Sequence, residues 1–245
     1  MPTRAARRMT TWLHEQRLEA VRDVVRARGA RSILDLGCGD GDLLCRLAVE
    51  PRIERIVGID LDRGALARLR ARLARHGAAA TARVDLVHGS MIEGASARTG
   101  FDCALLIETI EHVDPARLSG LERAVFAGMR PSAVVVTTPN AEFNRLLGVP
   151  SHRFRHPGHR FEWDRAGFRR WAAGAAARNG YAVACRDIAG YHRDLGGASQ
   201  MAVFRIAAGP RDGAGAGFGP VAPVSVPPGA DSGSANCPAC AGTSR

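Results

Sequence analysis

The chain has 245 residues, enough for one domain with a sizeable hydrophobic core but too few for two ordinary domains with linkers. Its 46% apolar and 24% charged residues are ordinary for a soluble globular protein, and no stretch approaches the roughly 20 apolar residues of a membrane span. Lysine is absent, so arginine alone supplies the positive charge behind a net +10, which favours an acidic partner such as nucleic acid. The basic N-terminal segment lacks an apolar signal sequence, so we expect a cytoplasmic protein with reduced cysteines and no membrane association.

The order of predicted elements indicates the fold class. Residues 1–30 are predicted to be helical, because apolar side chains recur there at helical spacing. Short β-branched runs then alternate with helical stretches, and we expect strands at residues 33–36, 56–59, 84–87, 101–107, 133–137, 181–185 and 201–206. Helices are expected at residues 42–48, 63–75, 118–129 and 164–178. This alternation predicts an α/β fold with a mostly parallel sheet covered by helices on both faces.

The composition changes after the last predicted strand. The predicted organisation is therefore a helical segment over residues 1–30, the main domain over 31–208 and a tail over 209–245. The tail is rich in Gly, Pro, Ala and Ser, and we expect it to be disordered. Cys237 and Cys240 have the spacing of half a zinc knuckle, but no second pair of ligands lies near them, so we predict no zinc site there.

A glycine-rich loop follows the first predicted strand, in the segment Asp35-Leu36-Gly37-Cys38-Gly39-Asp40-Gly41. Glycines at these positions let the backbone turn tightly and approach a bound cofactor. Asp60 ends the second predicted strand, about 20 residues further on, where a carboxylate can accept both hydroxyls of an adenosine ribose. The spacing is G-x-G-x-G, whereas NAD-type Rossmann domains carry G-x-G-x-x-G, so an NAD-binding domain is the weaker alternative.

With these features the chain resembles the class I S-adenosylmethionine (SAM)-dependent methyltransferases. The resemblance implies a Rossmann-like sheet of seven mostly parallel strands whose last strand is antiparallel. It also implies SAM as cofactor, with Asp60 on the ribose and the glycine-rich loop beneath the methionine part. The cofactor-binding residues that it implies are Asp35, Gly37, Cys38, Gly39, Asp60, Ser90, Met91 and Ile107.

Residue types that bind metals follow the fourth predicted strand, at Glu108, Glu111 and His112. The carboxyl ends of the strands form the ligand-binding edge of an open α/β sheet, so these residues should lie beside the cofactor. If the segment turns helically, the three share one face and form a mixed oxygen and nitrogen site suited to Mn, Co or Mg. His156 and His159 follow the fifth predicted strand in a loop that can fold over the same edge. A helix cap and surface histidines are the plain alternatives.

Taken together, three segments closely resemble one methyltransferase family: Glu108-Thr109-Ile110-Glu111-His112, Thr138-Pro139-Asn140 and Arg155-His156-Pro157-Gly158-His159-Arg160-Phe161-Glu162-Trp163. The family is the metal-dependent RNA 3′-terminal ribose 2′-O-methyltransferases, which protect small RNAs in eukaryotes and mark repaired RNA ends in bacteria. The resemblance extends from about Leu13 to Ile206, including His14-Glu15-Gln16-Arg17 and Ser199-Gln200-Met201-Ala202-Val203-Phe204. It implies one divalent metal ion held by Glu108, Glu111, His112 and His159.

The chain departs from the family's pattern at two places. A Glu that usually follows the Phe-Glu-Trp segment as part of a capping box is absent after Asp164, which concerns helix stability more than chemistry. Bacterial members also carry an N-terminal domain that helps an RNA ligase, for which this chain has no room. A partnership with an RNA-repair ligase or kinase-phosphatase is therefore an open expectation.

The resemblance implies methyl transfer from SAM to the 2′-OH of the 3′-terminal ribose of RNA. A terminal ribose with free 2′-OH and 3′-OH can chelate one cation, and coordination lowers the pKa of a hydroxyl as it does for metal-bound water. His112, His156 and Glu108 are the predicted catalytic residues, with His156 as candidate general base. Phe161 and Trp163 are expected to pack in the core rather than stack on a base. The candidate phosphate contacts are Arg153, Arg155, Arg160, Arg165, Arg169 and Arg170.

Two other functions are considered. A metal-dependent O-methyltransferase acting on a small catechol-like diol is the first, because such a diol also chelates a metal. A non-catalytic RNA-binding or repair-complex subunit with a vestigial fold is the second. The basic charge and the extent of the motif match favour RNA over a small molecule. The complete glycine loop, Asp60 and all four ligand positions favour an enzyme over a vestigial fold.

Overall fold

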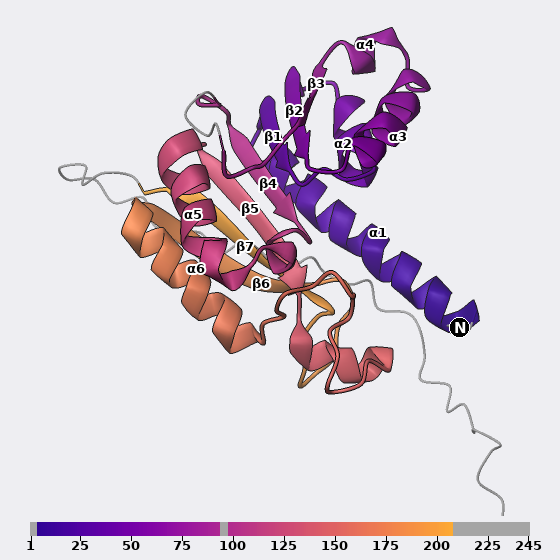
Figure 1. Ribbon diagram of the computed structural model, residues 1–245, viewed down its shortest axis with the longest axis vertical. Coiled ribbons are helices and arrows are strands. Elements are labelled where there is room, and N and C mark those ends of the chain that lie inside the picture. The colour runs from indigo at the N-terminus through magenta and orange to yellow at the C-terminus, as the bar shows by residue number, and fades with distance from the viewer. Residues whose placement is uncertain (1–3, 94–97, 208–245) are drawn as a thin grey trace, which may run out of the picture. The chain divides into compact units, whose positions relative to one another are not determined.

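Seven strands form one sheet in the order β3-β2-β1-β4-β5-β7-β6 (Figure 1). The structure is a computed structural model that describes residues 4–93 and 98–207, with side chains from residue 11 onward. Strands β1 to β5 pair in parallel, whereas β7 lies antiparallel between β5 and β6, which confirms the predicted seven-stranded sheet with a reversed last strand. The strands are β1 (Ser32–Leu36), β2 (Arg55–Asp60), β3 (Val84–His88), β4 (Cys103–Ile107), β5 (Ala133–Pro139), β6 (Tyr181–Ile188) and β7 (Ser199–Ile206).

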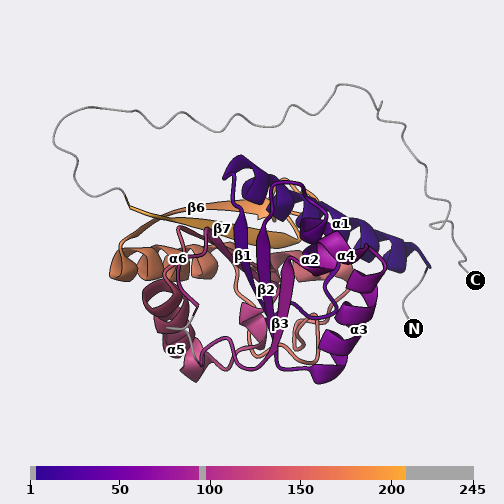
Figure 2. The same cartoon turned by 90° about the horizontal axis from the view of Figure 1, so that it is seen from above.

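Helices cover both faces of the sheet (Figure 2). One face carries α1 (Arg4–Ala27), α2 (Asp42–Ala48) and α3 (Arg63–Ala74), and the other carries α5 (Leu118–Glu122) and α6 (Arg165–Asn179). Among the helices in the described part, none is long and apolar enough to cross a membrane. The shorter helices are α4 (Ala78–Thr81), the 3-10 helices η2 (Ile110–His112), η3 (Pro115–Arg117) and η5 (Ala141–Leu147), and the π-helix η4 (Arg123–Met129).

The predicted helix at 118–129 is present but changes type along its length. It begins as α5 and continues from Arg123 as the π-helix η4, which ends at Arg130 in a left-handed conformation. A π-helix is wider than an α-helix, and its backbone bonds span five residues instead of four, so hydrophobic spacing alone does not distinguish the two. The difference lies in the backbone, because Ala124, Val125 and Phe126 are buried as the apolar pattern requires.

Alternate side chains of the strands enter two separate hydrophobic cores. Successive strand residues point to opposite faces of a sheet, so a fully apolar strand needs cover on both sides. One core lies under α1, α2 and α3 and takes Ile33, Cys103, Leu105 and Val135 from the strands. The other lies under α5 and α6 and takes Leu34, Ala104, Leu106 and Val134. Burial on both faces explains why these strands contain unbroken runs of apolar residues.

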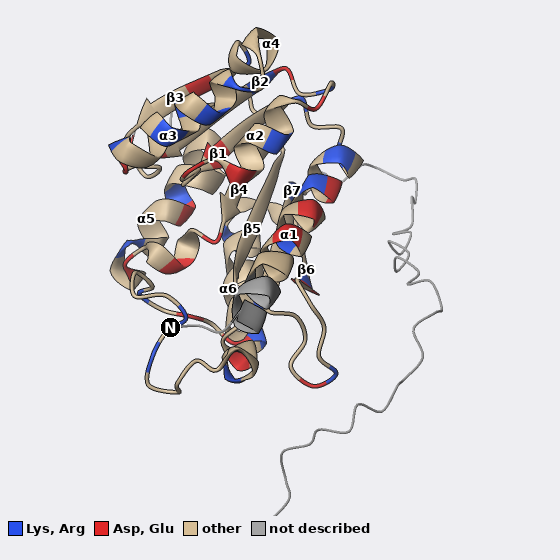
Figure 3. Cartoon of the chain, turned by 90° about the vertical axis from the view of Figure 1, so that its right-hand side faces the viewer, with Lys and Arg blue, Asp and Glu red and all other residues tan. Residues whose placement is uncertain are grey.

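Helix α1 is fixed to the sheet by apolar and ionic contacts. Leu18, Val21 and Val25 are at most 2% exposed in the first core. On the outer face, where basic and acidic side chains alternate along the helix (Figure 3), Arg22 and Arg26 both donate to Glu50 at 2.6 Å. The helix is thereby held across the sheet, and its side chains reach the carboxyl ends of the strands.

The helix α6 forms despite the missing capping-box Glu. Asp164 is its N-cap, and its side chain accepts a hydrogen bond from the Gly167 backbone at 2.6 Å. A carboxylate from another element, Glu142 of η5, accepts from the Arg165 backbone at 3.2 Å and from the Arg165 side chain at 2.9 Å. A first-turn N–H is therefore satisfied from outside the helix. The predicted tail, with Cys237 and Cys240, lies outside the described residues.

Phe168 offers a test of the second core. Its fully buried side chain packs against Trp163 and Trp171, and replacing it by alanine leaves a large cavity. We expect Phe168→Ala to lower the free energy of unfolding by about 3–5 kcal/mol, measured by urea denaturation. Phe154→Ala is the matched control, because the Phe154 side chain is exposed, and it should change stability by less than about 0.5 kcal/mol. Equal effects of the two substitutions would contradict the assignment of this core.

Candidate active site at the carboxyl edge of the sheet

A cavity of about 490 Å³ lies at the carboxyl ends of β1, β2, β3 and β4. This volume is in the range of small-molecule and cofactor sites. Four predicted cofactor residues line it, namely Gly37, Asp60, Ser90 and Met91. The lining also includes Glu108 and His112 from the predicted metal cluster, so the two predicted sites adjoin each other. Lining residues to which the sequence analysis gave no role are Ile59, Leu61, Ile92, Thr109, Val113, Asp114 and Arg117.

The glycine-rich loop is pinned to the end of β2. Gly37 and Cys38 donate backbone hydrogen bonds to the Ile59 carbonyl at 2.8 and 3.1 Å, and Gly39 donates to Asp60 Oδ2 at 2.7 Å. Gly37 has φ +83°, and a Cβ there would lie 2.5 Å from Thr109 Cγ2, so only glycine fits. The loop and the carboxylate that should bind a ribose are therefore held as one unit.

The other four predicted cofactor residues lie outside the cavity lining. Asp35 and Cys38 are buried, and Gly39 contributes its backbone to Asp60 as described. Ile107 packs against the first core. The role of these four residues in binding the cofactor stays a prediction.

Burial makes the Asp35 carboxyl a weaker acid than an exposed aspartate. The side chain is 3% exposed, and the lack of water together with the nearby Asp60 carboxylate raises the pKa of Asp35 to about 7. A carboxyl with this pKa carries its proton through much of the acid range, whereas the same group in an unfolded chain has lost it.

The two glutamates after β4 occupy different environments. Glu108 has φ +52°, a left-handed conformation rare for a side-chain-bearing residue, and its carboxylate accepts from Thr137 Oγ1 at 3.0 Å and pairs with Arg17 at 2.5 Å. Glu111 is completely buried, and its Oε2 accepts from Thr138 Oγ1 at 3.0 Å. Its Oε1 has no hydrogen-bond partner among the described residues. Burial, reinforced by the Glu108 charge, holds the pKa of Glu111 well above its usual value.

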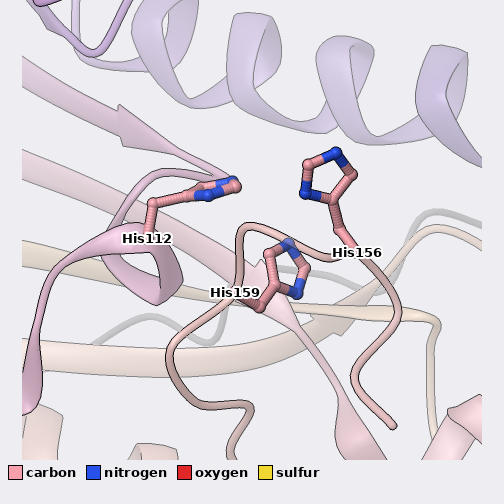
Figure 4. Close-up of side chains that lie close together, drawn as sticks. All are labelled: His112, His156 and His159. Atoms are coloured by element: carbon pink, nitrogen blue, oxygen red, sulfur yellow. The ribbon is translucent and has the colours of Figure 1, made fainter.

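Three histidines from two segments gather beside these glutamates (Figure 4). One ring nitrogen from each of His112, His156 and His159 lies within 4.8 Å of the others. The predicted loop closure is therefore present in the structure, because His112 follows β4 while the other two belong to the loop at residues 148–163 after η5. The His159 Nε2 atom is 4.0 Å from Glu111 Oε1, the carboxylate oxygen that lacks a partner.

Hydrogen bonds to the second ring nitrogen distinguish the histidines. His112 Nδ1 lies 3.1 Å from the Gly158 carbonyl and His159 Nδ1 lies 2.5 Å from Glu162 Oε1, so in both rings Nδ1 carries the hydrogen and Nε2 keeps a free lone pair. His156 differs, because its Nδ1 accepts from the Gly158 backbone at 3.0 Å, and its Nε2 therefore carries the hydrogen in the neutral ring. Burial and the neighbouring His159 lower the pKa of His112, which favours the neutral form that binds metals.

This donor set fits a divalent cation. His159 Nε2 lies 4.0 Å from the unpartnered Glu111 Oε1, the His112 ring centroid lies 4.8 Å from that of His159, and a cation would satisfy both imidazoles and the carboxylate oxygen. Oxygen and imidazole ligands together suit Mn²⁺, Co²⁺ or Mg²⁺. Glu108 is less available, because both of its oxygens already have partners in Thr137 and Arg17.

The histidine loop is held by Arg155 and Glu162. The Arg155 guanidinium donates to the Ala198 and Asn140 carbonyls at 2.9 and 3.0 Å, and Glu162 Oε1 accepts from the Arg155 backbone at 2.7 Å. Arg155 is therefore a structural residue, which corrects its predicted contact with RNA phosphates. Arg165 is likewise bound to Glu142, and Arg169 lies 3.9 Å from Asp187, whereas Arg160 lines the cavity.

Phe161 and Trp163 pack against the second core, with ring centroids 4.4 Å apart, as the sequence predicted. The supporting residues of the glutamates were not predicted individually. Arg17 and Ser199 lie in segments that matched the family, yet nothing in the sequence links their side chains to Glu108, to which both are hydrogen-bonded or paired. Thr137 and Thr138 could have been found, since they end β5 beside the glutamates.

The fold and the cavity define a class of protein. A seven-stranded sheet with a reversed last strand, a G-x-G-x-G loop after β1 and a carboxylate at the end of β2 are the features of the SAM-dependent methyltransferases. A family described as "Methyltransferase domain" matches residues 34–135.

Individual relatives indicate a narrower class than this general methyltransferase family. The "Small RNA 2'-O-methyltransferase" of Rattus norvegicus is 37% identical over 203 residues, which cover 79% of this chain and 51% of that protein. The methyltransferase domain of bacterial CtHen1 superposes with a TM-score of 0.70 at 35% identity, covering 79% of this chain and 99% of that one. The small RNA methyltransferase HEN1 superposes with a TM-score of 0.71 at 30% identity, covering 79% of this chain and 25% of that one.

This chain therefore belongs to the family of the Hen1 methyltransferase domain. It spans about half the length of the vertebrate relatives it matches, 51% for the rat protein and 54% for the protein of Gallus gallus.

The pKa of Asp35 predicts how stability depends on pH. The folded chain holds the extra proton between the unfolded pKa of about 3.9 and the folded value of about 7, so this group's contribution to stability is lost as pH rises through that window. Asp35→Asn removes the loss, and we expect the substitution to stabilise the protein by up to about 4 kcal/mol more at pH 8 than at pH 4. Urea denaturation at several pH values measures this. The exposed Asp85→Asn is the control, and a pH-independent difference for Asp35→Asn would contradict the buried, protonated carboxyl.

Proposed function

We propose that this chain transfers a methyl group from SAM to the 2′-OH of the 3′-terminal ribose of RNA. The observation that carries the proposal is the facing arrangement of His112, His159 and the unpartnered Glu111 oxygen at the rim of the cavity. The similarity to small RNA 2′-O-methyltransferases supports the substrate class. The net charge of +10 agrees with a nucleic-acid substrate.

The cavity is where SAM fits best, and SAM supplies an activated methyl group when bound. Asp60 already accepts from two backbone N–H groups, and its oxygens retain lone pairs for the ribose hydroxyls of the cofactor. Gly37 permits close approach because a side chain there would meet Thr109. Ser90 and Met91 line the part of the cavity beside β3, where the adenine is expected.

Glu108, Glu111, His112 and His159 would hold the divalent metal ion. When bound, such a cation lowers the pKa of a coordinated hydroxyl. Glu162 orients His159 through Nδ1, and the Gly158 carbonyl orients His112 in the same way. Glu108 would bind the cation more readily if Arg17 released its Oε2.

His156 is the proposed general base. It is exposed, and its ring centroid lies 5.5 Å from His112 and 5.4 Å from His159. Its Nδ1 now accepts from Gly158, so taking a proton at that atom requires this hydrogen bond to open. Arg117 and Arg160 line the cavity and form no ion pair within the part of the chain that the structure describes, and we assign them to the phosphate nearest the RNA end.

The proposed mechanism selects RNA ends by their free hydroxyl groups rather than by base sequence. A ribose within a strand has its 3′ oxygen in a phosphodiester, and an end with a 3′-phosphate has lost one of two adjacent hydroxyls. The proposal therefore requires both the 2′-OH and the 3′-OH to be free. A separately encoded RNA-repair ligase or kinase-phosphatase partner and a cytoplasmic location stay predictions.

Methyl transfer from labelled SAM to a short RNA tests the function directly. We expect incorporation in the presence of Mn²⁺, and none with EDTA, with a 2′-deoxy terminus or with a 3′-phosphate. Labelling of an RNA with a blocked 3′ end would overturn the end-selection mechanism. If SAM binds but no RNA is labelled, the small catechol-like diol becomes the better substrate class.

Glu111→Gln tests the metal site without an activity assay. At 100 times the dissociation constant, a bound cation stabilises the wild-type protein by about 2.7 kcal/mol, seen as a rise in melting temperature on adding Mn²⁺. We expect the variant to lose this rise while melting without metal no lower than the wild type, because the substitution removes a buried acidic group that lacks a partner. Glu54→Gln, on an exposed side chain, is the control and should keep the full metal response. A metal response in Glu111→Gln equal to that of wild type would exclude Glu111 as a ligand.

A further inference from the structure

Exposed aromatic side chains and unpaired arginines occur together on α1, on η5 and on two loops next to the histidine cluster. Trp12, Phe154 and Tyr191 are 53%, 48% and 82% exposed, and they are the three aromatic residues among the large exposed hydrophobic side chains of the described part. Arg145, Arg153 and Arg193 are exposed, and no hydrogen bond or ion pair of their side chains is found within the described ranges. We call the six residues the aromatic-basic surface: Trp12, Arg145, Arg153, Phe154, Tyr191 and Arg193.

The segments that carry this surface are packed together. The Gly190 backbone donates to Gln16 Oε1 of α1 at 2.7 Å, and a Cβ on Gly190 would lie 3.7 Å from the Trp12 ring. Tyr191 is the next residue, so it and Trp12 belong to one patch. Beneath them lies a small apolar cluster drawn from α1, η5 and the β6–β7 loop: Leu13, Phe143, Ala189, Leu195 and Ala198. Figure 1 shows η5 and the loop between β6 and β7 at the same end of the sheet.

The surface is continuous with the candidate active site. Phe154 is two residues before His156 in the same loop. Arg155 between them binds Asn144 of η5 at 2.7 Å and the Ala198 carbonyl at 2.9 Å, which ties the histidine loop to both neighbouring segments. A chain that places its end at the histidines therefore meets Phe154 and the patch around Tyr191 as it leaves.

The chemistry of the surface fits single-stranded RNA. Aromatic rings stack on bases of any sequence, and arginines without acidic partners neutralise phosphates. The exposed acidic residue beside them, Asp194, adjoins Arg193 and leaves the arginines in excess. Of the four remaining large exposed hydrophobics, only Leu146 lies beside the surface, on η5 next to Arg145, whereas Val49, Leu61 and Ile206 lie on other elements. A protein-binding patch would instead concentrate apolar side chains around a dehydrated centre.

We propose that the aromatic-basic surface binds the nucleotides that precede the 3′-terminal one. Bases stack on Trp12, Tyr191 and Phe154, while Arg145, Arg153 and Arg193 hold the connecting phosphates. The inference rests on the proposed function, because the terminal nucleotide is placed at the histidine cluster. It adds that the enzyme requires an unpaired 3′ segment several nucleotides long, since a base in a duplex cannot stack on a side chain.

The test measures KM and kcat for a 12-nucleotide single-stranded RNA, together with RNA binding by fluorescence anisotropy in the presence of S-adenosylhomocysteine. We expect Tyr191→Ala and Trp12→Ala each to raise KM and the dissociation constant roughly tenfold while kcat stays unchanged. Arg193→Ala should weaken binding and reduce the slope of log affinity against log salt by about 0.7. Pairing the last six nucleotides with a complementary strand should reproduce the loss of affinity in the wild-type enzyme.

Val49→Ala and Arg52→Ala are the matched controls, because they truncate an exposed apolar and an exposed basic side chain between α2 and β2, at the opposite edge of the sheet. Unchanged KM and affinity in the Tyr191, Trp12 and Arg193 variants, with wild-type methyl transfer intact, would overturn this inference alone. Wild-type enzyme that binds the 12-mer through this surface but labels no RNA would overturn the proposed function instead. Loss of a protein partner in these variants, with RNA affinity retained, would assign the surface to protein binding and also overturn the inference.

Discussion

The buried carboxylate of Glu111 is the constraint on which the site depends. A carboxylate in a place without water is costly unless hydrogen bonds or a cation compensate it, and here Thr138 satisfies one oxygen only. The segment after β4 turns at Glu108 in a left-handed conformation, which directs Glu111 into the protein. The Arg160 backbone donates to the Glu111 carbonyl at 2.7 Å, so the histidine loop is attached to the same short helix whose carboxylate it faces. The candidate metal ligands are therefore arranged around the Glu111 oxygen that has no hydrogen-bond partner.

Arg155 and Asn140 connect that atom to the rest of the fold. The Asn140 side chain donates to the Leu195 and Gly197 carbonyls, and Arg155 binds the Asn140 carbonyl and Ala198. Three loops that follow β5, η5 and β6 are thus joined by buried hydrogen bonds from side chains to backbone. Such bonds need exact placement, since an unpaired buried group loses more than a typical bond gains. The loop after η5 carries His156, His159 and Phe154, and the loop after β6 carries Tyr191 and Arg193.

The sequence predicted the fold well because local pattern and tertiary structure agree in the strands. An apolar run such as Val134-Val135-Val136 is stable only as a strand covered on both faces. The spacing of the glycines identified the candidate cofactor loop. Residue type and chain position singled out the histidines that gather at the candidate site, and their role as metal ligands stays a prediction. The role of Arg155 was missed because an arginine in a basic loop looks the same whether it faces solvent or is buried among carbonyl groups. Arg17 was missed as a partner of Glu108 for a related reason, since no local pattern reports a contact across 91 residues of sequence.

The contact between Arg17 and Ser199 joins segments 182 residues apart, near the two ends of the described chain. β7 must insert between β5 and β6 before Ser199 reaches this position, and β5–β7 pairing closes a long loop. Contacts so distant in sequence form late in folding and slowly. During synthesis the ribosome releases the first strands and α1 long before Ser199 emerges. A nascent or truncated chain can therefore form the nucleotide-binding half of the sheet before the candidate active site is complete. The site is completed only when the last strand, β7, is in place.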